Sequence, residues 1–355
     1  MFKRQITPTA AVDEIAAAFE ARNIEQLEKA THRLIAAARK ASPEQIQPAV
    51  ERLTTFVDRL AYGPGGRLGQ IVGSVADMGT DPLPVLPVLV ERACAAMEDA
   101  SRFAEMYQDL FGEDPPDSED EDAIPATVER FTAAAVQRGI DEDPADLLLQ
   151  AWFACDSCVQ PVLFLCQRAD VRKALPQRDR LLTAIDNVRK SHGTPQWLHG
   201  LLLVLDDVAL TVVHRKSGRG YRVTIGGIGD NFQLHTLLAA RLIGSERQGW
   251  LPGTPPTPAM VAAADGTGDP APPGGIRGQF NLVDLNGKWL WNEGRPADIP
   301  VTDGERVVVI DPPAYPRSWN AARAYPLMTP TMRVDRQLSP QEAHDWLARA
   351  NPSEY

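Results

Sequence analysis

The chain has 355 residues, of which 44% are hydrophobic and 23% are charged, so it is long enough for two domains or one large one with a buried core. Its net charge of −11 comes almost wholly from residues 1–195, which carry 21 Lys and Arg against 31 Asp and Glu, whereas residues 196–355 carry 15 against 16. A surface of this sign repels phosphate backbones, and the charge therefore argues against a nucleic-acid partner.

The sequence predicts neither a secretion signal nor a membrane segment. Residues 1–4 include two basic side chains, but no apolar stretch follows them. The longest apolar runs, such as residues 201–205, are far too short to cross a bilayer. We therefore expect a cytoplasmic protein with no membrane partner.

The cysteines raise one candidate for metal or redox chemistry. Cys155, Cys158 and Cys166 could supply three thiolates to zinc, with His192 or His199 as a fourth ligand, and the first two could instead form a redox pair. Their spacing is also that of one helix face, where a free cysteine is commonly a small core residue. We favour core packing and predict no metal site, and the sequence identifies no cofactor.

The first half of the sequence predicts a series of amphipathic helices, because apolar residues recur every three to four positions. Asn23 is placed to cap one helix, and Ser42-Pro43-Glu44-Gln45 has the pattern of a capping box. The run Gly63–Gly66 is expected to end a helix, and Pro161 to break or kink a later one. The predicted ranges are 11–22, 24–40, 44–61, 67–78, 84–111, 125–138, 144–158, 162–174 and 177–190.

The arrangement of these helices stays open between an irregular bundle and a stack of helix pairs, since no sequence signature repeats. One acidic segment, Glu113–Asp122, carries seven acidic residues in ten together with two prolines. Such a composition is typical of a solvated loop, although it could recruit a basic partner.

The hydrophobic pattern changes near Pro195 from a helical to a strand-like repeat. Strands are expected at 201–205, 209–214 and 221–225, and the tight turns between them favour antiparallel pairing. Asp230 or Asn231 can cap a helix over 231–243. Further along the chain we expect strands at 279–285 and 288–291 joined by an Asn286-Gly287 hairpin, a strand at 307–310, and a terminal helix opened by Ser339-Pro340-Gln341-Glu342.

These patterns predict an α+β protein. Residues 1–195 would form an all-α domain, either a helical bundle or a stack of helix pairs, and residues 196–355 a smaller α+β domain with an antiparallel sheet. Residues 251–275 contain seven prolines and five glycines, and we expect them to form an irregular insertion or lid on the second domain.

Acidic and basic groups gather near predicted strand ends in the second domain. Asp230 at the helix cap could orient His235 as a general base, and Glu293 could act as a further acid. Asn231 lies four residues before His235 and shares its helix face. The plainer interpretation is that Asp230 only caps the helix while His235 lies at the surface or hydrogen-bonds within the fold.

Aromatic residues accompany these groups. Trp289 and Trp291 alternate along one strand and therefore share a face, where they could form a wall for a ring, a sugar or a peptide. Tyr315 follows the next strand and could join them. The alternative is that the tryptophan pair packs beneath the insertion.

Two further motifs have mainly structural interpretations. Gly226-Gly227-Ile228-Gly229 before a helix could bind an anion, but it lacks the spacing and the lysine of a phosphate loop. Asp311-Pro312-Pro313-Ala314-Tyr315 superficially resembles the Asp-Pro-Pro-Tyr motif of amino-methyltransferases, yet the inserted Ala314 breaks the spacing. We interpret the first as a tight connection and the second as a proline-rich strand exit.

Two hypotheses for function follow. The favoured one is an interaction or adaptor protein whose acidic helical domain contacts another protein, preferably a basic one. The alternative is an enzyme that acts on a small molecule or peptide in a pocket of the second domain, with Asp230, His235 and Glu293 as acid and base groups and Trp289 and Trp291 as its wall.

Overall fold

The computed structural model describes residues 6–269, 275–320 and 323–354. Two compact units make up the chain. The helical unit comprises the chain up to Cys166 together with Asp170–Leu202, and the sheet unit comprises Gln167–Ala169 together with the chain from Leu203. Helices build the first unit and a mixed sheet with helices builds the second, so the predicted α+β class is confirmed.

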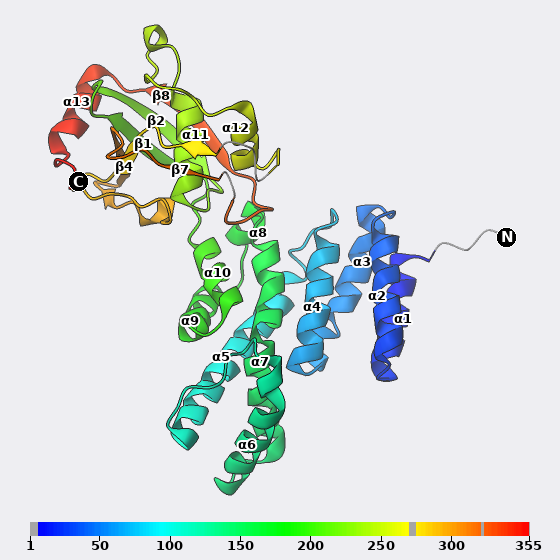
Figure 1. Ribbon diagram of the computed structural model, residues 1–355. Coiled ribbons are helices and arrows are strands. Elements are labelled where there is room, and N and C mark those ends of the chain that lie inside the picture. Colours follow the sequence, from blue (N-terminus) through cyan, green and yellow to red (C-terminus); the bar gives the residue numbers. More distant parts are fainter. Residues whose placement is uncertain (1–5, 270–274, 321–322, 355) are drawn as a thin grey trace. The chain divides into compact units, whose positions relative to one another are not determined.

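The helical unit consists largely of the amphipathic segments that the sequence predicts (Figure 1). The Asn23 side chain accepts a hydrogen bond from the Gln26 amide at 3.0 Å, and the Gln45 side chain accepts one from the Ser42 amide at 3.0 Å, so both predicted helix starts are confirmed. The helices are α1 (Pro8–Glu20), α2 (Ile24–Ala38), α3 (Pro43–Thr54), α4 (Tyr62–Ala76), α5 (Leu86–Phe111), α6 (Ile124–Gln137), α7 (Glu142–Leu165), α8 (Ala169–Lys173), α9 (Arg178–Val188) and α10 (Gly193–Leu202), with 3-10 helices at Val57–Arg59 and Glu121–Ala123.

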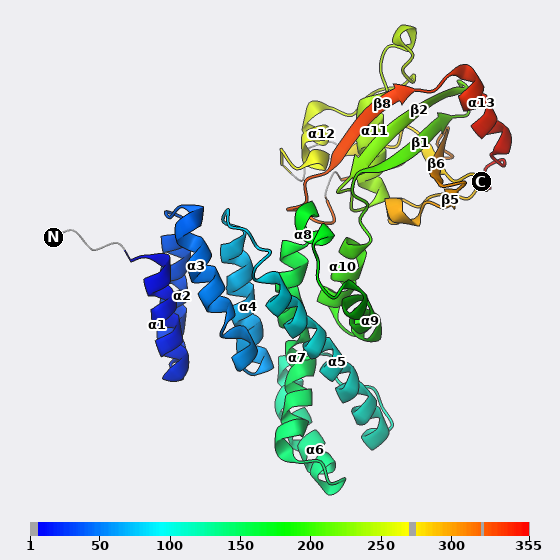
Figure 2. The ribbon, with the colours of Figure 1, turned by 180° about the vertical axis from the view of Figure 1, so that it is seen from behind.

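Helix α7 is the central element of this unit, since it packs against α4, α5, α6 and α10. Figure 2 shows it between α4 and α5. The aromatic side chains of Phe103, Phe131 and Trp152 meet where α5, α6 and α7 converge, with ring centroids 4.7 Å apart for the first two and 5.5 Å apart for Phe103 and Trp152. This cluster supplies large buried apolar surface to the core of the unit.

Two helices do not end where the sequence predicts a break. The run Gly63–Gly66 lies inside α4, because α4 packs so closely on α7 that a Cβ atom on Gly66 would come within 2.3 Å of Ser157 Oγ. Pro161 lies inside α7 without ending it, and a Cβ atom on Gly69 would come within 3.2 Å of the proline ring. Close packing between small residues here outweighs the local tendency of glycine and proline to break a helix.

The predicted strand over 201–205 is also wrong. Leu201 and Leu202 complete α10, which includes Pro195, and both leucines are buried. A short continuous apolar run does not distinguish a buried strand from a buried helix. The change from helix to strand therefore falls after Leu202 and not at Pro195.

The sheet unit contains a six-stranded sheet in the order β4-β6-β1-β2-β8, with β5 paired to β6, and a separate pair of β3 and β7. Strands β1 and β2 form the predicted antiparallel hairpin, but β1 pairs with β6 in parallel, so the sheet is mixed and not purely antiparallel. Parallel pairing of β1 with β6 is possible because the chain between the two strands is long and includes a helix. The strands are β1 (Val208–His214), β2 (Arg219–Gly226), β3 (Ile276–Arg277), β4 (Asn281–Val283), β5 (Val301–Thr302), β6 (Glu305–Asp311), β7 (Ser318–Trp319) and β8 (Thr331–Gln337).

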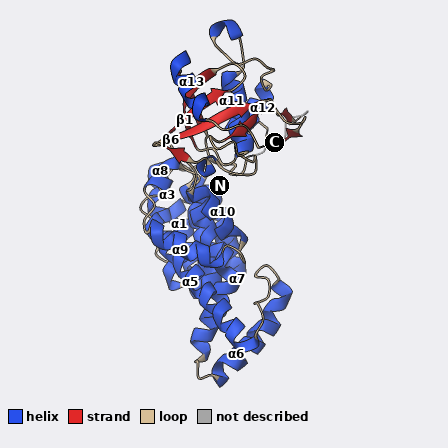
Figure 3. Ribbon diagram, turned by 90° about the vertical axis from the view of Figure 1, so that its left-hand side faces the viewer, coloured by secondary structure: helices blue, strands red, loops and turns tan. Residues whose placement is uncertain are grey.

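Each face of this sheet packs against a different helix (Figure 3). Leu210 and Val212 of β1 pack in one cluster with Leu234 of α11 (Asn231–Leu242), whereas Val213 packs in another with Ala343 of α13 (Pro340–Arg349). The two-residue period of a strand thus gives each face its own helix. Both predicted helices of this unit and the strand predicted at 307–310, which lies in β6, are confirmed.

The two remaining predictions in this unit are confirmed only in part. Residues 251–275 are not wholly irregular, because they include α12 (Pro258–Asp265), and the part of that prediction at 270–274 lies outside the described residues. The Asn286-Gly287 turn is present, with a φ of +87° at Gly287, but the second strand of the hairpin is reduced to a bridge between Val283 and Trp289.

The close approach of α4 and α7 gives a first prediction. Replacing Gly66 by Ala should lower the free energy of unfolding by about 1–3 kcal/mol, because its Cβ meets Ser157 Oγ and the Ser157 backbone. Gly63→Ala is the matched control, since nothing lies within 4 Å of a Cβ there, and it should be neutral or slightly stabilising. Urea unfolding followed by circular dichroism measures both, and equal effects of the two substitutions would contradict the packing argument.

Candidate functional site

The candidate site is built on the first turn of α11. The chain leaves β2 at Gly226 and turns through Gly227, whose φ is +62° and where a Cβ atom would lie 2.5 Å from the Thr329 carbonyl oxygen. Asp230 then caps the helix, accepting a hydrogen bond from the Gln233 amide at 2.8 Å. The glycine cluster is thus a tight strand-to-helix connection, and the Asp230 carboxylate occupies the start of α11.

A neighbouring segment, residues 289–294, closes over this helix start. The backbone amides of Asn231 and Phe232 donate to the carbonyl oxygens of Gly294 and Asn292 at 2.8 and 3.1 Å. The Asn231 side chain donates to the Trp291 carbonyl oxygen at 2.8 Å. These bonds satisfy amides that a helix start otherwise leaves open, and they place the 289–294 segment beside Asp230.

Asp230 and Glu293 form an acidic pair at this position. Burial raises the pKa of Asp230 to about 6, the charge of Glu293 adds to the rise, and hydrogen bonds from the Gln233 and Phe232 amides oppose it. Glu293 itself is exposed. A carboxyl group with such a pKa is partly protonated near neutral pH and can serve as a proton donor or as a hydrogen-bond acceptor.

His235 is separated from this acidic pair. It is 0% exposed, and its Nε2 accepts a hydrogen bond from the Gln279 amide at 3.2 Å. Its ring packs against Phe280 and against the edge of Trp319, with centroids 4.3 and 4.8 Å away. Among the described residues, neither ring nitrogen makes a hydrogen bond to a carboxylate.

The electrostatic state of His235 follows from this burial. Burial and the Arg317 charge lower its pKa to about 3, with burial as the larger cause, while a backbone hydrogen bond at Phe280 opposes the shift. The imidazole is therefore neutral at physiological pH, and because Nε2 accepts a bond, the proton lies on Nδ1. The structure does not bring the three predicted acid and base residues into one constellation, only Asp230 and Glu293.

The three aromatic residues Trp289, Trp291 and Tyr315 lie together, and two of them are exposed. Trp289 and Trp291 stack with ring centroids 4.7 Å apart and an interplanar angle of 16°, and Tyr315 meets Trp289 edge-on at 5.9 Å. Trp291 is 59% exposed and Tyr315 is 52% exposed. We call Trp289, Trp291 and Tyr315 the aromatic surface.

Residues that the sequence analysis did not assign complete the surroundings. The guanidinium carbon of Arg317 lies 5.1 Å from the centroid of a Trp289 ring and 5.7 Å from that of Trp319. Arg317 and Trp319 are two residues apart, a spacing that places side chains on one face of a strand, and this signal could have identified them.

Buried amide groups also lie in this unit. The side-chain nitrogen and oxygen of Asn281 and the side-chain oxygens of Asn231 and Asn292 are buried without a hydrogen-bond partner among the described residues. A buried polar group without a partner costs free energy, so a water molecule or a small polar ligand is expected to satisfy them.

The residues of the other candidate motifs have structural roles. Asp311 is buried and its carboxylate pairs with Arg215 at 2.8 Å, so the proline-rich strand exit holds a structural ion pair. Cys155, Cys158 and Cys166 are buried, and burial raises the pKa of each thiol. Within residues 6–269, 275–320 and 323–354, no three His, Cys, Asp or Glu side chains are grouped as metal ligands.

One described helix, α7, is long and apolar enough to cross a membrane by length and composition. Half of its apolar stretch is buried inside the protein, and the core helices of soluble proteins pass the same criterion.

Comparisons with protein-family models, with curated proteins and with solved structures found no match to this chain. The fold and the geometry of the sites are therefore the basis for the proposals below.

The raised pKa of Asp230 gives a second prediction. Its contribution to stability is fully present below the ordinary aspartate pKa of about 3.9 and is lost as the pH rises through about 6, because the folded state disfavours the ionised form. Asn also caps helices but cannot ionise. Asp230→Asn should therefore match the wild type near pH 4 and exceed its free energy of unfolding by on the order of 2 kcal/mol near pH 7.5.

Urea unfolding at the two pH values measures this difference. Asp303→Asn is the control, because Asp303 is an exposed carboxylate elsewhere in the same unit, with 75% of its side chain accessible. A stability gain of Asp230→Asn that is the same at both pH values would show that Asp230 is not buried as described.

Proposed function

We propose that the protein is a non-catalytic interaction protein, and that the aromatic surface of its sheet unit holds a basic segment of a partner protein. The observation that carries the proposal is the exposure of the Trp291 and Tyr315 side chains, together with exposed Glu293 two residues after Trp291, whose charge acts on Asp230. Large exposed aromatic side chains next to acidic groups suit a lysine or arginine side chain, which is attracted by the ring face and by the carboxylate together.

The stacking geometry supports this choice of partner. One face of Trp291 is covered by Trp289, so its exposed area lies on the other face and the ring edges. The inner ring already interacts with a cation of the same chain, since Arg317 lies over Trp289. The outer face of Trp291 offers a second cation the same kind of contact, with exposed Glu293 two residues along the chain.

The state of His235 supports binding over catalysis. A general base must reach its substrate, yet this imidazole is buried, neutral and engaged with the Gln279 amide. Free, buried cysteines agree with a reducing cytoplasm, where we propose that the protein acts.

The acidic segment Glu113–Asp122 of the helical unit is a competing location for a basic partner. Part of it is already engaged, because Glu113 pairs with Arg130 at 2.5 Å and the Pro116 carbonyl oxygen accepts a hydrogen bond from Trp152 at 3.0 Å. We therefore place the basic partner on the aromatic surface and treat the acidic segment as the alternative to be tested.

An enzyme or small-molecule binding protein is the second candidate. It is favoured by the raised pKa of Asp230, which suits a general acid, and by the partnerless amide groups of Asn281 and Asn292. Native mass spectrometry of the purified protein tests it: a small molecule that co-purifies, and is lost in an Asn281→Leu variant that still folds, would favour this candidate.

Binding of a fluorescein-labelled oligo-arginine peptide, measured by anisotropy, tests the proposed interaction. Trp291→Ala and Glu293→Gln should each weaken binding by roughly three- to tenfold, because each removes one of the paired attractions. An oligo-glutamate peptide of equal length should not bind the aromatic surface.

Two control variants distinguish binding at the aromatic surface from non-specific binding of the peptide. Trp197→Ala removes another exposed tryptophan, 53% accessible and in the helical unit, and Glu121→Gln removes a charge from the acidic segment. Both should leave the affinity unchanged. If Glu121→Gln weakens binding while Trp291→Ala does not, the basic partner belongs to the acidic segment and the proposal is wrong.

A further inference from the structure

A groove with the opposite charge preference lies in the helical unit. It is formed by the turn between α1 and α2, the chain before α4 and the first turns of α4, and it encloses about 720 Å³. These elements lie close together in the unit (Figure 1). Gly63 and Pro64 of the first turn of α4 are among the residues that line it.

The floor of the groove is apolar. Phe19, Leu27, Leu60 and Ile71 line it and are each only partly buried, while Leu68 beneath them is fully buried. Four large apolar side chains that remain partly accessible in one groove are typical of a surface that another chain covers.

The rim of the groove is basic. Arg22, Arg59 and Arg67 line it and are exposed. Among the described residues, none of the three side chains forms an ion pair, although Arg33 and Arg52 of the neighbouring helices pair with carboxylates at 2.7 and 2.5 Å. Three unpaired arginines around one groove are notable in a unit whose net charge is strongly negative.

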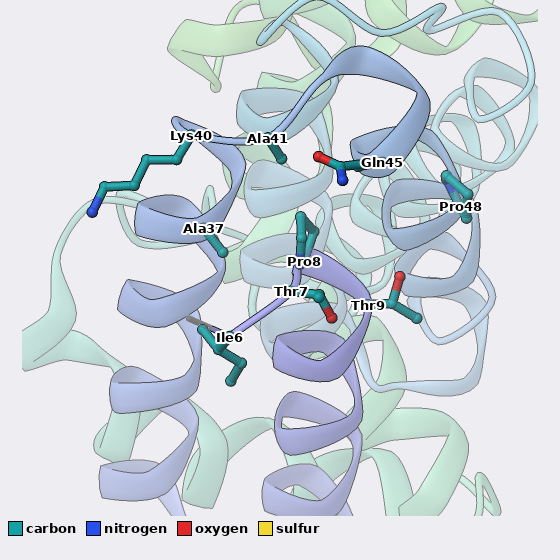
Figure 4. A pocket seen from close by; sticks show the side chains of 9 residues that line it. All are labelled: Ile6, Thr7, Pro8, Thr9, Ala37, Lys40, Ala41, Gln45 and Pro48. Atoms are coloured by element: carbon teal, nitrogen blue, oxygen red, sulfur yellow. The ribbon is translucent and has the colours of Figure 1, made fainter. Parts of the chain in front are cut away.

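A second hollow in the same unit lacks a rim of charged side chains among its described lining residues and serves as a comparison. It encloses about 520 Å³ between the starts of α1 and α3 and the end of α2 (Figure 4). Two of its polar side chains serve helix starts, since Thr7 accepts from the Ala10 amide and Gln45 accepts from the Ser42 amide. Lys40 points away from the hollow in Figure 4, so among the described residues that line it no charged side chain is directed into it.

We infer that the arginine-rimmed groove docks an acidic amphipathic segment of a partner protein. The apolar side chains of that segment cover Phe19, Leu27, Leu60 and Ile71, and its carboxylates pair with the three arginines at the rim. Charge complementarity selects this occupant over a basic or purely apolar one, because a cation would meet three unpaired guanidinium groups. The inference concerns a different unit from the aromatic surface and does not rest on the function proposed for it.

The experiment uses the full chain and a designed probe. The probe is a fluorescein-labelled helical peptide with leucines on one face and glutamates on the other, and its matched partner carries lysines in place of the glutamates. The acidic peptide should bind at micromolar concentration and the basic one should not bind the groove. Replacing Arg22, Arg59 and Arg67 together by Gln should weaken the acidic peptide by roughly tenfold, and raised salt should do the same.

Arg39→Gln is the matched control, because Arg39 is an exposed arginine of the same unit outside the groove, and it should leave the affinity unchanged. All four substitutions are at exposed positions, and circular dichroism confirms that the variants fold. The inference is overturned if the acidic peptide does not bind, if the basic peptide binds as well, or if the triple variant retains the affinity. Trp291→Ala should have no effect here, so failure of this inference is distinguishable from failure of the function proposed above.

Discussion

The closure of the α11 start by the 289–294 segment is the constraint on which the candidate site depends. A helix start leaves amides without partners, and in this protein Asp230 and the carbonyl oxygens of Asn292 and Gly294 supply them. Because these bonds fix the segment in place, Trp291 and Glu293 are held close to the helix start, although Trp291 lies 60 positions after Asn231 in the sequence. The same hydrogen bonds thus satisfy the start of α11 and fix the position of the aromatic surface.

The same arrangement separates two kinds of ionisable group. Asp230 lies at the helix cap, where burial raises its pKa to about 6, while His235, one helical turn further, lies among Phe280 and Trp319 with its pKa lowered to about 3. Acid and base are therefore held apart, and the exposed part of the site consists of ring faces and carboxylates. The groove in the helical unit has the opposite character, because exposed arginines line its rim.

Local signals in the sequence were sufficient for much of this fold. The caps at Asn23, Ser42 and Asp230 were predictable, because each depends on a side chain and an amide a few residues away. The strand β8 was missed: it is an edge strand whose residues are mostly exposed, so the alternation of Met332 and Val334 is weak.

Features set by distant contacts were not predictable. Gly66 and Pro161 lie inside helices because α4 and α7 pack closely, and the parallel pairing of β1 with β6 depends on the path of the chain between them. For the site, the residue types and their clustering at strand ends were identified, as was the placement of Trp289 and Trp291 on one face, but not the stacking of the two rings. The burial of His235 was not, since its spacing from Asn231 fits an exposed helix face as well as a buried one.

Whether His235 is sealed from solvent decides between recognition and acid–base chemistry at this site. Nitrogen-15 NMR of the histidine rings, with the His235 signals assigned from a His235→Gln variant, measures this directly. The structure predicts one neutral tautomer, protonated on Nδ1, with signals that do not change between about pH 5 and pH 8. A His235 ring that titrates near the ordinary histidine pKa of about 6.5 would contradict the account.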